Sequence, residues 1–245
     1  MTTTELYNIV TESLKTKQPL FVPRIGDGEA MCLSGDREKQ DWLFFRQLGT
    51  LLHDDDITII QNNLKKAYQS ANIIGMPENK REGLNEFWYK CGEILHEIGA
   101  GDKPAVTNDF HNEWLDSGTL KELLTNRDQL YYVSCHDLTE RFKEVYNISE
   151  VKGFHISGER YFFPEKSGRH YPHQFNQVEQ WIDSINMKGA LFIYGAGVVG
   201  KIYGLWAALQ GAVALDLGNV LDLLAGFKTR GLGRAPGARI EKYKI

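Results

Sequence analysis

Six residues near the N-terminus, Arg24 to Glu29, bring together an arginine, two glycines and two carboxylates. They follow the short apolar run Leu20–Val22, which we expect to be a strand with the six residues in the loop at its end. Open α/β folds place their ligands at such strand ends. In extended backbone, side chains two residues apart point the same way, so Asp27 and Glu29 would converge. Two hard oxygen ligands beside an arginine suit a divalent cation and the phosphates that it neutralises.

A second candidate site is a glycine-rich turn that follows one expected strand and opens an expected helix. Its glycines would let backbone amides approach a phosphate, whose charge the N-terminus of the helix favours. An acidic residue follows at the end of the next expected strand, where a dinucleotide-binding fold keeps the acid that binds a ribose. The pattern predicts a phosphate- or nucleotide-binding turn; an NAD site, and a turn whose glycines serve packing alone, are the alternatives. The residues are Gly195, Gly197, Gly200, Lys201 and Asp216.

Four further side chains are candidates for removing a proton from a hydroxyl group: Asp222, Glu159, His155 and His173. Asp222 would face the loop of Asp27 and Glu29, or else be an acid that complements the dipole of a helix. The other three belong to a loop, residues 155–173, whose aromatic and charged residues suit carbohydrate binding or an ordinary surface loop. The sequence does not rank the four. His136, after the expected strand of residues 130–135, and Asn108, after Val106, are further pocket candidates.

The composition is that of a soluble globular protein. The chain has 245 residues, of which 42% are hydrophobic and 24% charged, enough for one domain with a full core. A net charge of −4 argues against a general nucleic-acid binder. The cysteines, Cys32, Cys91 and Cys135, are far apart, which favours reduced thiols over disulfides or a zinc site. Without a visible signal peptide or an apolar run of membrane-spanning length, we expect a cytoplasmic protein with no transmembrane segment.

Hydrophobic periodicity predicts alternating strands and helices, with strands that are apolar almost throughout. This pattern favours an α/β fold with a mostly parallel sheet and helices on both faces. The expected domain spans residues 1–227, and the basic tail, residues 228–245, is expected to be mobile, as a solvated terminus or as a flap over an anionic substrate. Expected strands cover residues 20–22, 72–76, 130–135, 151–156, 190–194 and 212–217; expected helices cover 4–17, 41–52, 55–70, 82–98, 138–146, 175–185 and 198–210.

Taken together, these motifs resemble those of the bacterial GT-D-type glycosyltransferases. The string Arg24-Ile-Gly-Asp-Gly-Glu29 carries the resemblance most specifically, followed by the glycine turn and the segment Asp216–Asp222, and the resemblance spans roughly residues 18–225. It implies a Rossmann-like fold and a D-x-E motif, Asp27 and Glu29, for metal and nucleotide-sugar binding. It also makes Arg24, Gly26 and Gly28 neighbours of the donor.

The motifs and the resemblance together predict a metal-dependent glycosyltransferase of the Leloir type. It would move a sugar from a nucleotide-diphosphate sugar, UDP-linked, to a glycan, surface polysaccharide or glycoprotein. Asp27 and Glu29 would hold Mn²⁺ or Mg²⁺, and the glycine turn with Asp216 would form part of the donor pocket. The alternatives are an NAD-dependent oxidoreductase or epimerase that uses the turn at Gly195, and a non-catalytic protein that binds a nucleotide or a glycan. The sugar, the acceptor, inversion or retention, and assembly into a homo-oligomer stay open.

Overall fold

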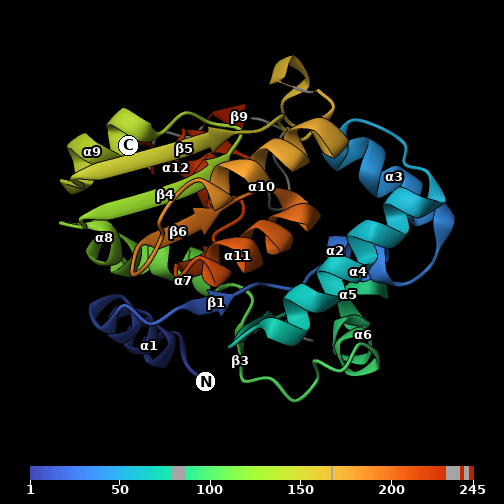
Figure 1. Cartoon of the computed structure of the whole chain (residues 1–245), viewed down its shortest axis with the longest axis horizontal. Helices are drawn as coiled ribbons and strands as arrows, with labels where there is room; N and C mark the ends of the chain where they lie inside the picture. The colour runs from blue at the N-terminus through green and yellow to red at the C-terminus, as the bar shows by residue number, and fades with distance from the viewer. Residues whose placement is uncertain (79–85, 167, 230–237, 240–242) are drawn as a thin grey trace.

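A five-stranded parallel sheet forms the centre of the computed structural model, which describes residues 1–78, 86–166, 168–229, 238–239 and 243–245 (Figure 1). Its strand order is β1-β7-β6-β4-β5, and every neighbouring pair is parallel. Each strand lies within one residue of its expected bounds, because buried parallel strands are continuous apolar runs. The strands are β1 (Leu20–Val22), β4 (Gln129–Ser134), β5 (Glu150–His155), β6 (Leu191–Tyr194) and β7 (Val213–Asp216).

Helices cover both faces of this sheet, which confirms the predicted α/β architecture. Alternate strand residues serve the two cores: Phe192 and Tyr194 belong to one, and Leu191 and Ile193 to the other. The first core is completed by α4 (Asp54–Ser70), α10 (Phe175–Asp183) and α11 (Gly200–Leu209). The second is completed by α1 (Thr3–Thr16), α7 (Phe110–Ser117), α8 (Thr119–Leu124), α9 (Thr139–Tyr146) and α12 (Val220–Leu224).

A second, two-stranded parallel sheet holds the segment that leaves β1. It consists of β2 (Ile74–Met76) and β3 (Ala105–Thr107), and β2 also pairs with the chain at Arg24. Gly75 N donates to Pro23 O, and Gly75 O accepts the N–H of Ile25, both at 2.9 Å. A Cβ at Gly75 would lie 2.7 Å from Arg24 Cγ, so the glycine permits this close approach. The backbone of Arg24 is therefore fixed between the two sheets.

Two expectations for the first half of the chain are wrong. The segment after Arg24 is not an extended loop: α2 (Asp27–Leu33) begins at Asp27 itself. Helix α3 (Arg37–Leu48) begins and ends four residues before the expected helix, residues 41–52. Its buried side includes Leu43, Phe44 and Leu48, whereas Trp42 and Phe45, whose spacing helped to predict the helix, face solvent.

The expected long helix over residues 82–98 is not a single helix in the part of the chain that the structure describes. Residues 79–85 lie outside the described residues, and the remainder forms α5 (Glu86–Tyr89) and α6 (Cys91–Glu97). The elements that were not expected include β3, α7 and α8. The residues of the two helices carry two small clusters of apolar side chains, at Phe110 and Trp114 and at Leu120, Leu123 and Leu124, all of them buried.

The described part of the tail is attached to the domain. Strand β8 (Phe227–Lys228) pairs in antiparallel fashion with β9 (Ala238–Arg239). At the C-terminal end, Ile245 N donates to Leu224 O at 3.1 Å, and Arg141 Nη1 donates to Ile245 O at 2.5 Å. Residues 230–237 and 240–242 lie outside the described residues, so a mobile flap stays a prediction.

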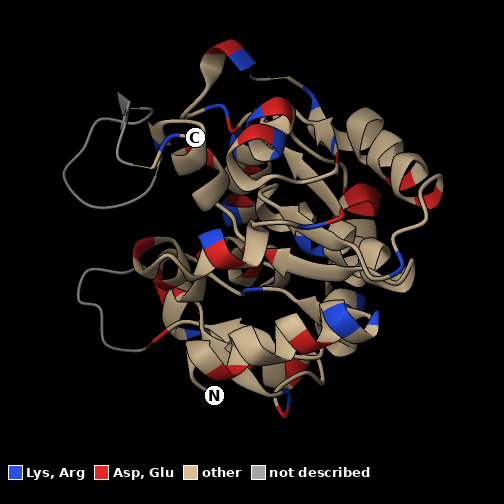
Figure 2. Ribbon diagram, turned by 90° about the vertical axis from the view of Figure 1, so that its left-hand side faces the viewer, with Lys and Arg blue, Asp and Glu red and all other residues tan. Residues whose placement is uncertain are grey.

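Charges of both signs alternate over the face drawn in Figure 2. This arrangement fits a small net charge of −4. None of the helices that the structure describes combines the length and the hydrophobicity that a membrane crossing demands.

Candidate functional site

A buried cluster of four charged side chains lies at the carboxyl ends of β1 and β7, and we call it the charge cluster: Arg24, Glu29, Lys201 and Asp216. Lys201 Nζ lies 2.5 Å from Glu29 Oε1 and 3.1 Å from Asp216 Oδ2. Arg24 Nη2 lies 3.2 Å from Asp216 Oδ1. The side chains are between 2% and 14% exposed. Two cations balance two anions, as burial of charge requires. The two motifs, far apart in the sequence, therefore meet in one place.

Pairing keeps the charge cluster ionised in spite of its burial. Burial alone would lower the pKa of Lys201, but the carboxylates of Asp216 and Glu29 outweigh it and raise the pKa above its usual value. Burial alone would raise the pKa of Asp216, but Arg24 and Lys201 outweigh it and hold the pKa below the usual range. The contact between Lys201 and Asp216 is thus one between full charges at neutral pH, which makes it strong.

The D-x-E pair lies in the first turn of α2. Glu29, the third helical residue, accepts the N–H of the N-cap residue Gly26 at its Oε2, at 2.9 Å. Asp27, the first helical residue, accepts the N–H of Gly28 at 2.9 Å. An α-helix turns about 100° per residue, so the two side chains leave the axis about 200° apart. The predicted convergence in extended backbone is wrong: Glu29 is 7% exposed and belongs to the charge cluster, whereas Asp27 is half-buried.

The glycine turn is packed against protein atoms. Gly197 has φ +57°, and a Cβ there would lie 2.4 Å from Gln47 Oε1, the atom that accepts the N–H of Val198 at 2.9 Å. A Cβ at Gly195 would lie 2.6 Å from Gly218 O, and one at Gly200 would lie 3.0 Å from Tyr194 Cδ2. This geometry supports the alternative in which the glycines serve packing. Contact of Gly195, Gly197, Gly200, Lys201 and Asp216 with a donor stays a prediction.

His111 extends the charge cluster towards α12. Arg24 Nη1 lies 2.8 Å from His111 Nε2 and 3.1 Å from His111 Nδ1, and the same Nε2 lies 3.0 Å from Asn219 Oδ1. Burial first, and the Arg24 guanidinium second, lower the pKa of His111 to about 3. The sequence analysis missed His111, since no spacing signal relates it to Arg24, 87 residues away.

A second group of polar side chains lies at the carboxyl end of β4, and we call it the His–Asp cluster: Lys166, His136, Asp222 and Thr229. Lys166 Nζ donates to His136 Nδ1 at 3.1 Å, so Nε2 carries the proton and donates to Asp222 Oδ1 at 3.0 Å. Thr229 Oγ1 donates to Asp222 Oδ2 at 2.6 Å. Both oxygens of this carboxylate are therefore oriented by a donor. The sequence analysis missed Lys166 and Thr229.

Aromatic rings cover the histidine of this cluster. Phe227 stacks on the His136 ring at 5.2 Å between centroids, and Phe163 meets it edge-on at 4.9 Å. The side chain of His136 is 3% exposed, whereas that of Asp222 is 19% exposed. The chain of hydrogen bonds therefore reaches solvent at its two ends, through the partly exposed carboxylate of Asp222 and through the exposed Lys166.

Helix α12 connects the two clusters. Its N-cap residue Asn219 contacts His111, and Asp222, three residues later, contacts His136. Residues three apart in a helix are neighbours on one face. The strand order adds a second argument: β5 lies on one side of β4 and the following strand, β6, on the other. Open α/β sheets bind ligands at such a switch point, outside the carboxyl ends of the strands. His136 follows β4, and the glycine turn follows β6.

The other candidate bases lie elsewhere. Glu159 forms an ion pair with Arg46 of α3. His155 ends the edge strand β5, where its Nε2 lies 3.2 Å from Tyr132 Oη. His173 is exposed in the turn His170–Gln174. Of the four candidate bases, Asp222 is the one that belongs to either cluster described above, namely to the His–Asp cluster.

Three potential metal ligands come close together at the His–Asp cluster. Ligand atoms of Cys135, His136 and Asp222 lie within 4.8 Å of one another. Two features oppose a metal there. Burial raises the pKa of the Cys135 thiol to about 12, and Lys166 occupies His136 Nδ1, which leaves the proton on Nε2. Metal ligation needs a thiolate and an unprotonated nitrogen.

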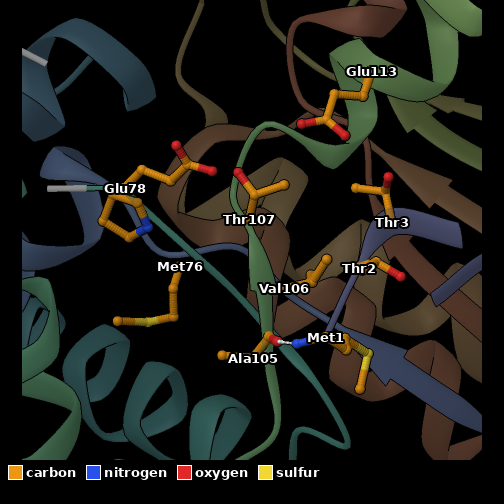
Figure 3. A pocket seen from close by; sticks show the side chains of 10 residues that line it. Met1, Thr2, Thr3, Met76, Glu78, Ala105, Val106, Thr107 and Glu113 are labelled. Atoms are coloured by element: carbon orange, nitrogen blue, oxygen red, sulfur yellow. Dashed lines mark hydrogen bonds between the residues drawn. The ribbon is translucent and has the colours of Figure 1, made fainter. Parts of the chain in front are cut away.

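A hollow of about 460 Å³ opens at the carboxyl ends of β2 and β3 (Figure 3). Figure 3 shows Glu78 and Glu113 on either side of Thr107, and the amino group of Met1 bonded to Ala105 O at 2.7 Å. None of the residues that the sequence analysis selected as site residues lines this hollow. Its relation to the two clusters is indirect, through Asn108, which follows β3 and whose side chain donates to Ile25 O at 2.7 Å.

Comparison with known proteins agrees with the fold. The sequence profile of the GT-D fold-like domain matches residues 1–224. One similar solved structure is a domain of unknown function 1792, reported to have a distinct glycosyltransferase fold; it has 13% identity and a TM-score of 0.60, with 100% of this chain and 89% of that one covered. A selenomethionine structure of domain of unknown function 1792 has 14% identity, a TM-score of 0.59, and coverage of 98% and 90%. No curated protein matches the chain.

Proposed function

Since this chain belongs to the GT-D-like family, whose fold suggests glycosyltransferase function, we propose that it transfers a sugar from a nucleotide-diphosphate donor, UDP-linked, to a hydroxyl group of a glycan, surface polysaccharide or glycoprotein. The observation that carries the proposal is the contact of Glu29 with Lys201 at 2.5 Å. It joins the R-x-G-D-G-E segment to the turn after β6, at the edge of the sheet where such folds bind ligands.

Asp27 is the residue that would present a divalent cation, Mn²⁺ or Mg²⁺, to the donor. Carboxylate oxygens are the ligands that these hard cations prefer, and Asp27 is half-buried rather than enclosed. Glu29 gives one oxygen to Lys201 and the other to Gly26 N, yet a carboxylate offers about four lone-pair positions, so it retains capacity for a metal-bound water. The donor set fits a hard cation. Such a cation, when bound, would stabilise the negative charge of the leaving nucleotide.

The charge cluster holds the D-x-E turn in place. Lys201 anchors Glu29, and Glu29 in turn closes the first turn of α2 on Gly26, so the position of Asp27 depends on a buried ion pair. Arg24 is bound to Asp216 and to His111, which orients its guanidinium along the edge of the sheet. We infer that Arg24 positions the site through these contacts. Gly26 and Gly28 belong to the same turn.

Asp222 is the candidate that would take the proton of the acceptor. His136 and Thr229 each donate to one of its oxygens, which leaves the remaining lone pairs for an incoming hydroxyl group. In an inverting reaction, the proton passes to Asp222 while the acceptor oxygen bonds to the anomeric carbon. The bond from that carbon to the diphosphate breaks, and its electrons leave with the nucleotide. Glu159, His155 and His173 remain alternatives that the same assay tests.

The packing of the glycine turn favours this function over an NAD-dependent oxidoreductase. Both oxygens of Asp216 are bound to buried cations, so the carboxylate does not face an open ribose position. The backbone N–H of Val198 is taken by Gln47. A cytoplasmic location is also part of the proposal, because the three cysteines are free thiols.

Release of nucleotide from a panel of UDP-, GDP- and TDP-sugars, with Mn²⁺, with Mg²⁺ or with a chelator, tests the donor side. We expect metal-dependent hydrolysis of a UDP-sugar, and an increase in melting temperature with UDP and Mn²⁺. Asp27→Asn should remove both, because it takes away the carboxylate that would hold the cation.

The matched control is Glu12→Gln, an acid on the surface of α1, which should behave as the parent does. Two results would contradict the proposal: hydrolysis of no donor with any metal, or an Asp27→Asn variant that responds to UDP and Mn²⁺ as the parent does. Binding of NAD(H) in place of UDP would support the oxidoreductase. Binding without any hydrolysis or transfer would support a non-catalytic protein.

A further inference from the structure

The outer side of α3 exposes large aromatic rings beside the loop of residues 157–166. Trp42 is 51% exposed, Phe45 45% and Tyr161 61%. We call this surface the α3 platform; it consists of Trp42, Phe45 and Tyr161 together with Arg46 and Arg160. Single exposed apolar side chains are ordinary, but a group of rings from two segments marks a surface that binds something.

Guanidinium groups hold these rings in place. Arg46 lies 5.0 Å from the ring centroid of Trp42 and 5.5 Å from that of Tyr161, and Arg160 lies 4.6 Å from that of Phe45. Arg160 N also donates to Arg46 O at 3.0 Å, which ties the loop to α3. The rings are thus ordered before any ligand arrives, which lowers the entropic cost of binding.

The α3 platform is connected to the His–Asp cluster by one short loop. Tyr161 lies two residues before Phe163, the ring that meets His136 at 4.9 Å, and five residues before Lys166, which donates to the same histidine. Gly158 N donates to Lys166 O at 3.0 Å and closes the loop. A ligand whose reacting end lies at Asp222 and whose body follows this loop would reach the platform.

We propose that the α3 platform binds sugar rings of the acceptor glycan, away from the hydroxyl group that reacts. The proposal rests on the proposed function and adds a subsite to it. Aromatic faces accommodate the C–H faces of sugar rings, and guanidinium N–H groups beside them donate to hydroxyl oxygens.

The charges around the platform favour a neutral ligand. On α3 and the loop, five basic residues face four acidic ones, so the net charge is +1; they are Arg37, Lys39, Arg46, Arg160 and Lys166 against Glu38, Asp41, Glu159 and Glu165. A surface for anionic lipids would carry a cluster of about four to eight basic residues without such compensation. A neutral, hydroxyl-rich chain therefore fits better than a lipid surface.

Binding to a printed glycan array, by the parent and by the double variant Trp42→Ala/Tyr161→Ala, tests the proposal. We expect the parent to bind a set of related glycans and the double variant to lose them. With an acceptor from that set, the KM of the acceptor should rise about tenfold while kcat stays the same, because the rings bind substrate and transition state alike. Tyr89→Ala removes an aromatic side chain of similar exposure, 44%, from α5 and should change nothing.

Donor hydrolysis without acceptor separates the two proposals. The double variant should release nucleotide at the parent's rate. If the parent hydrolyses no donor, the proposed function is contradicted. Binding to the glycan array would still test the subsite in that case. The subsite is wrong if the parent binds no glycan, or if the double variant binds as the parent does. It is also wrong if the variant instead loses binding to vesicles of phosphatidylcholine and phosphatidylglycerol, or loses a dimer seen in sedimentation.

Discussion

The charge cluster and the His–Asp cluster lie along the same edge of the sheet, but they differ in how they meet solvent. In the charge cluster the four side chains form ion pairs with one another, and Arg24, its most exposed member, has 14% of its side chain exposed. In the His–Asp cluster, a covered histidine supports Asp222, which is 19% exposed. A closed cluster can only hold its neighbours in position. An open one can exchange a proton with a ligand. The difference supports the proposed function, in which the first cluster positions the site and the second exchanges a proton with the acceptor.

The largest expected effect is on the charge cluster. Lys201→Met leaves Glu29 and Asp216 buried with one cation between them, and we expect the free energy of unfolding to fall by about 3–5 kcal/mol. Denaturation in urea measures it. The double variant Lys201→Met/Glu29→Gln should lose less than the sum of the single variants, because the stranded charge is gone. A loss below about 1 kcal/mol would mean that the paired charges do not hold this edge together.

On the His–Asp cluster, Asp222→Asn should lower the rate of sugar transfer by about 10²–10⁴, the usual contribution of a general base. The amide keeps an oxygen for His136, so stability should change little. The affinity for UDP should stay the same, since the proposal gives the donor to Asp27 and the acceptor to Asp222. His155→Gln and His173→Gln are the comparison; if either of them, and not Asp222→Asn, stops transfer, the base is misassigned.

The next largest effect concerns the pH dependence of stability, to which His111 beside the charge cluster contributes. Native His111 has a pKa of about 3 against an ordinary value of 6.5, so between these values the unfolded chain binds a proton that the native protein does not. The contribution of His111 is therefore full above pH 6.5 and is lost as the pH falls towards 3; at pH 5 the loss is roughly 2 kcal/mol. His111→Gln should flatten the decline of urea midpoints between pH 6.5 and 4.

Two other histidines serve as references for the pH dependence of the His111→Gln variant. Burial lowers the pKa of His170 to about 4, so the His111→Gln variant should retain part of the slope. His173→Gln, which changes an exposed ring, should keep the whole slope. An unchanged slope in His111→Gln would show that the ring does not stay neutral beside Arg24.

The smallest expected effect is that of Thr229→Val, which removes the donor to Asp222 Oδ2 at 2.6 Å. One lost hydrogen bond of about 0.5–1.5 kcal/mol should lower kcat roughly three- to tenfold and move the acidic limb of its pH profile. Thr229→Ser keeps the hydroxyl group and should restore both. If Thr229→Val lowers stability while kcat and the pH profile stay the same, the threonine has a structural role only.

The sheet was predictable from sequence because a strand buried on both faces must be apolar along its whole length. Leu191–Tyr194 shows this pattern directly, and Val213–Asp216 shows it up to its last residue, which belongs to the charge cluster. Helix α2 was not, because Gly26 and Gly28 suggested a loop. Its signal was nevertheless present: Glu29 stands at the third helical position, where a capping-box acid reaches back to the N-cap.

For the candidate site, the sequence indicated which segments matter but not how they pair. Nothing in the spacing could show that Lys201 binds Glu29, or that His136 binds Asp222, because these contacts span 172 and 86 residues of chain. Trp42 and Phe45 illustrate the opposite error. Their spacing is that of a core face, yet they point outward, since Leu43, Phe44 and Leu48 already fill the inner side.

Helix α12 makes the site intolerant of changes in length. Asn219 and Asp222 reach His111 and His136 only because they stand three positions apart in the chain. One residue inserted between them would turn Asp222 by about 100° around the helix axis and point its carboxylate away from His136. Loops elsewhere on the surface can grow or shrink at small cost. In this turn of α12, the number of residues matters as much as their identity. In a library of single-residue insertions across the chain, we expect the largest loss of function there.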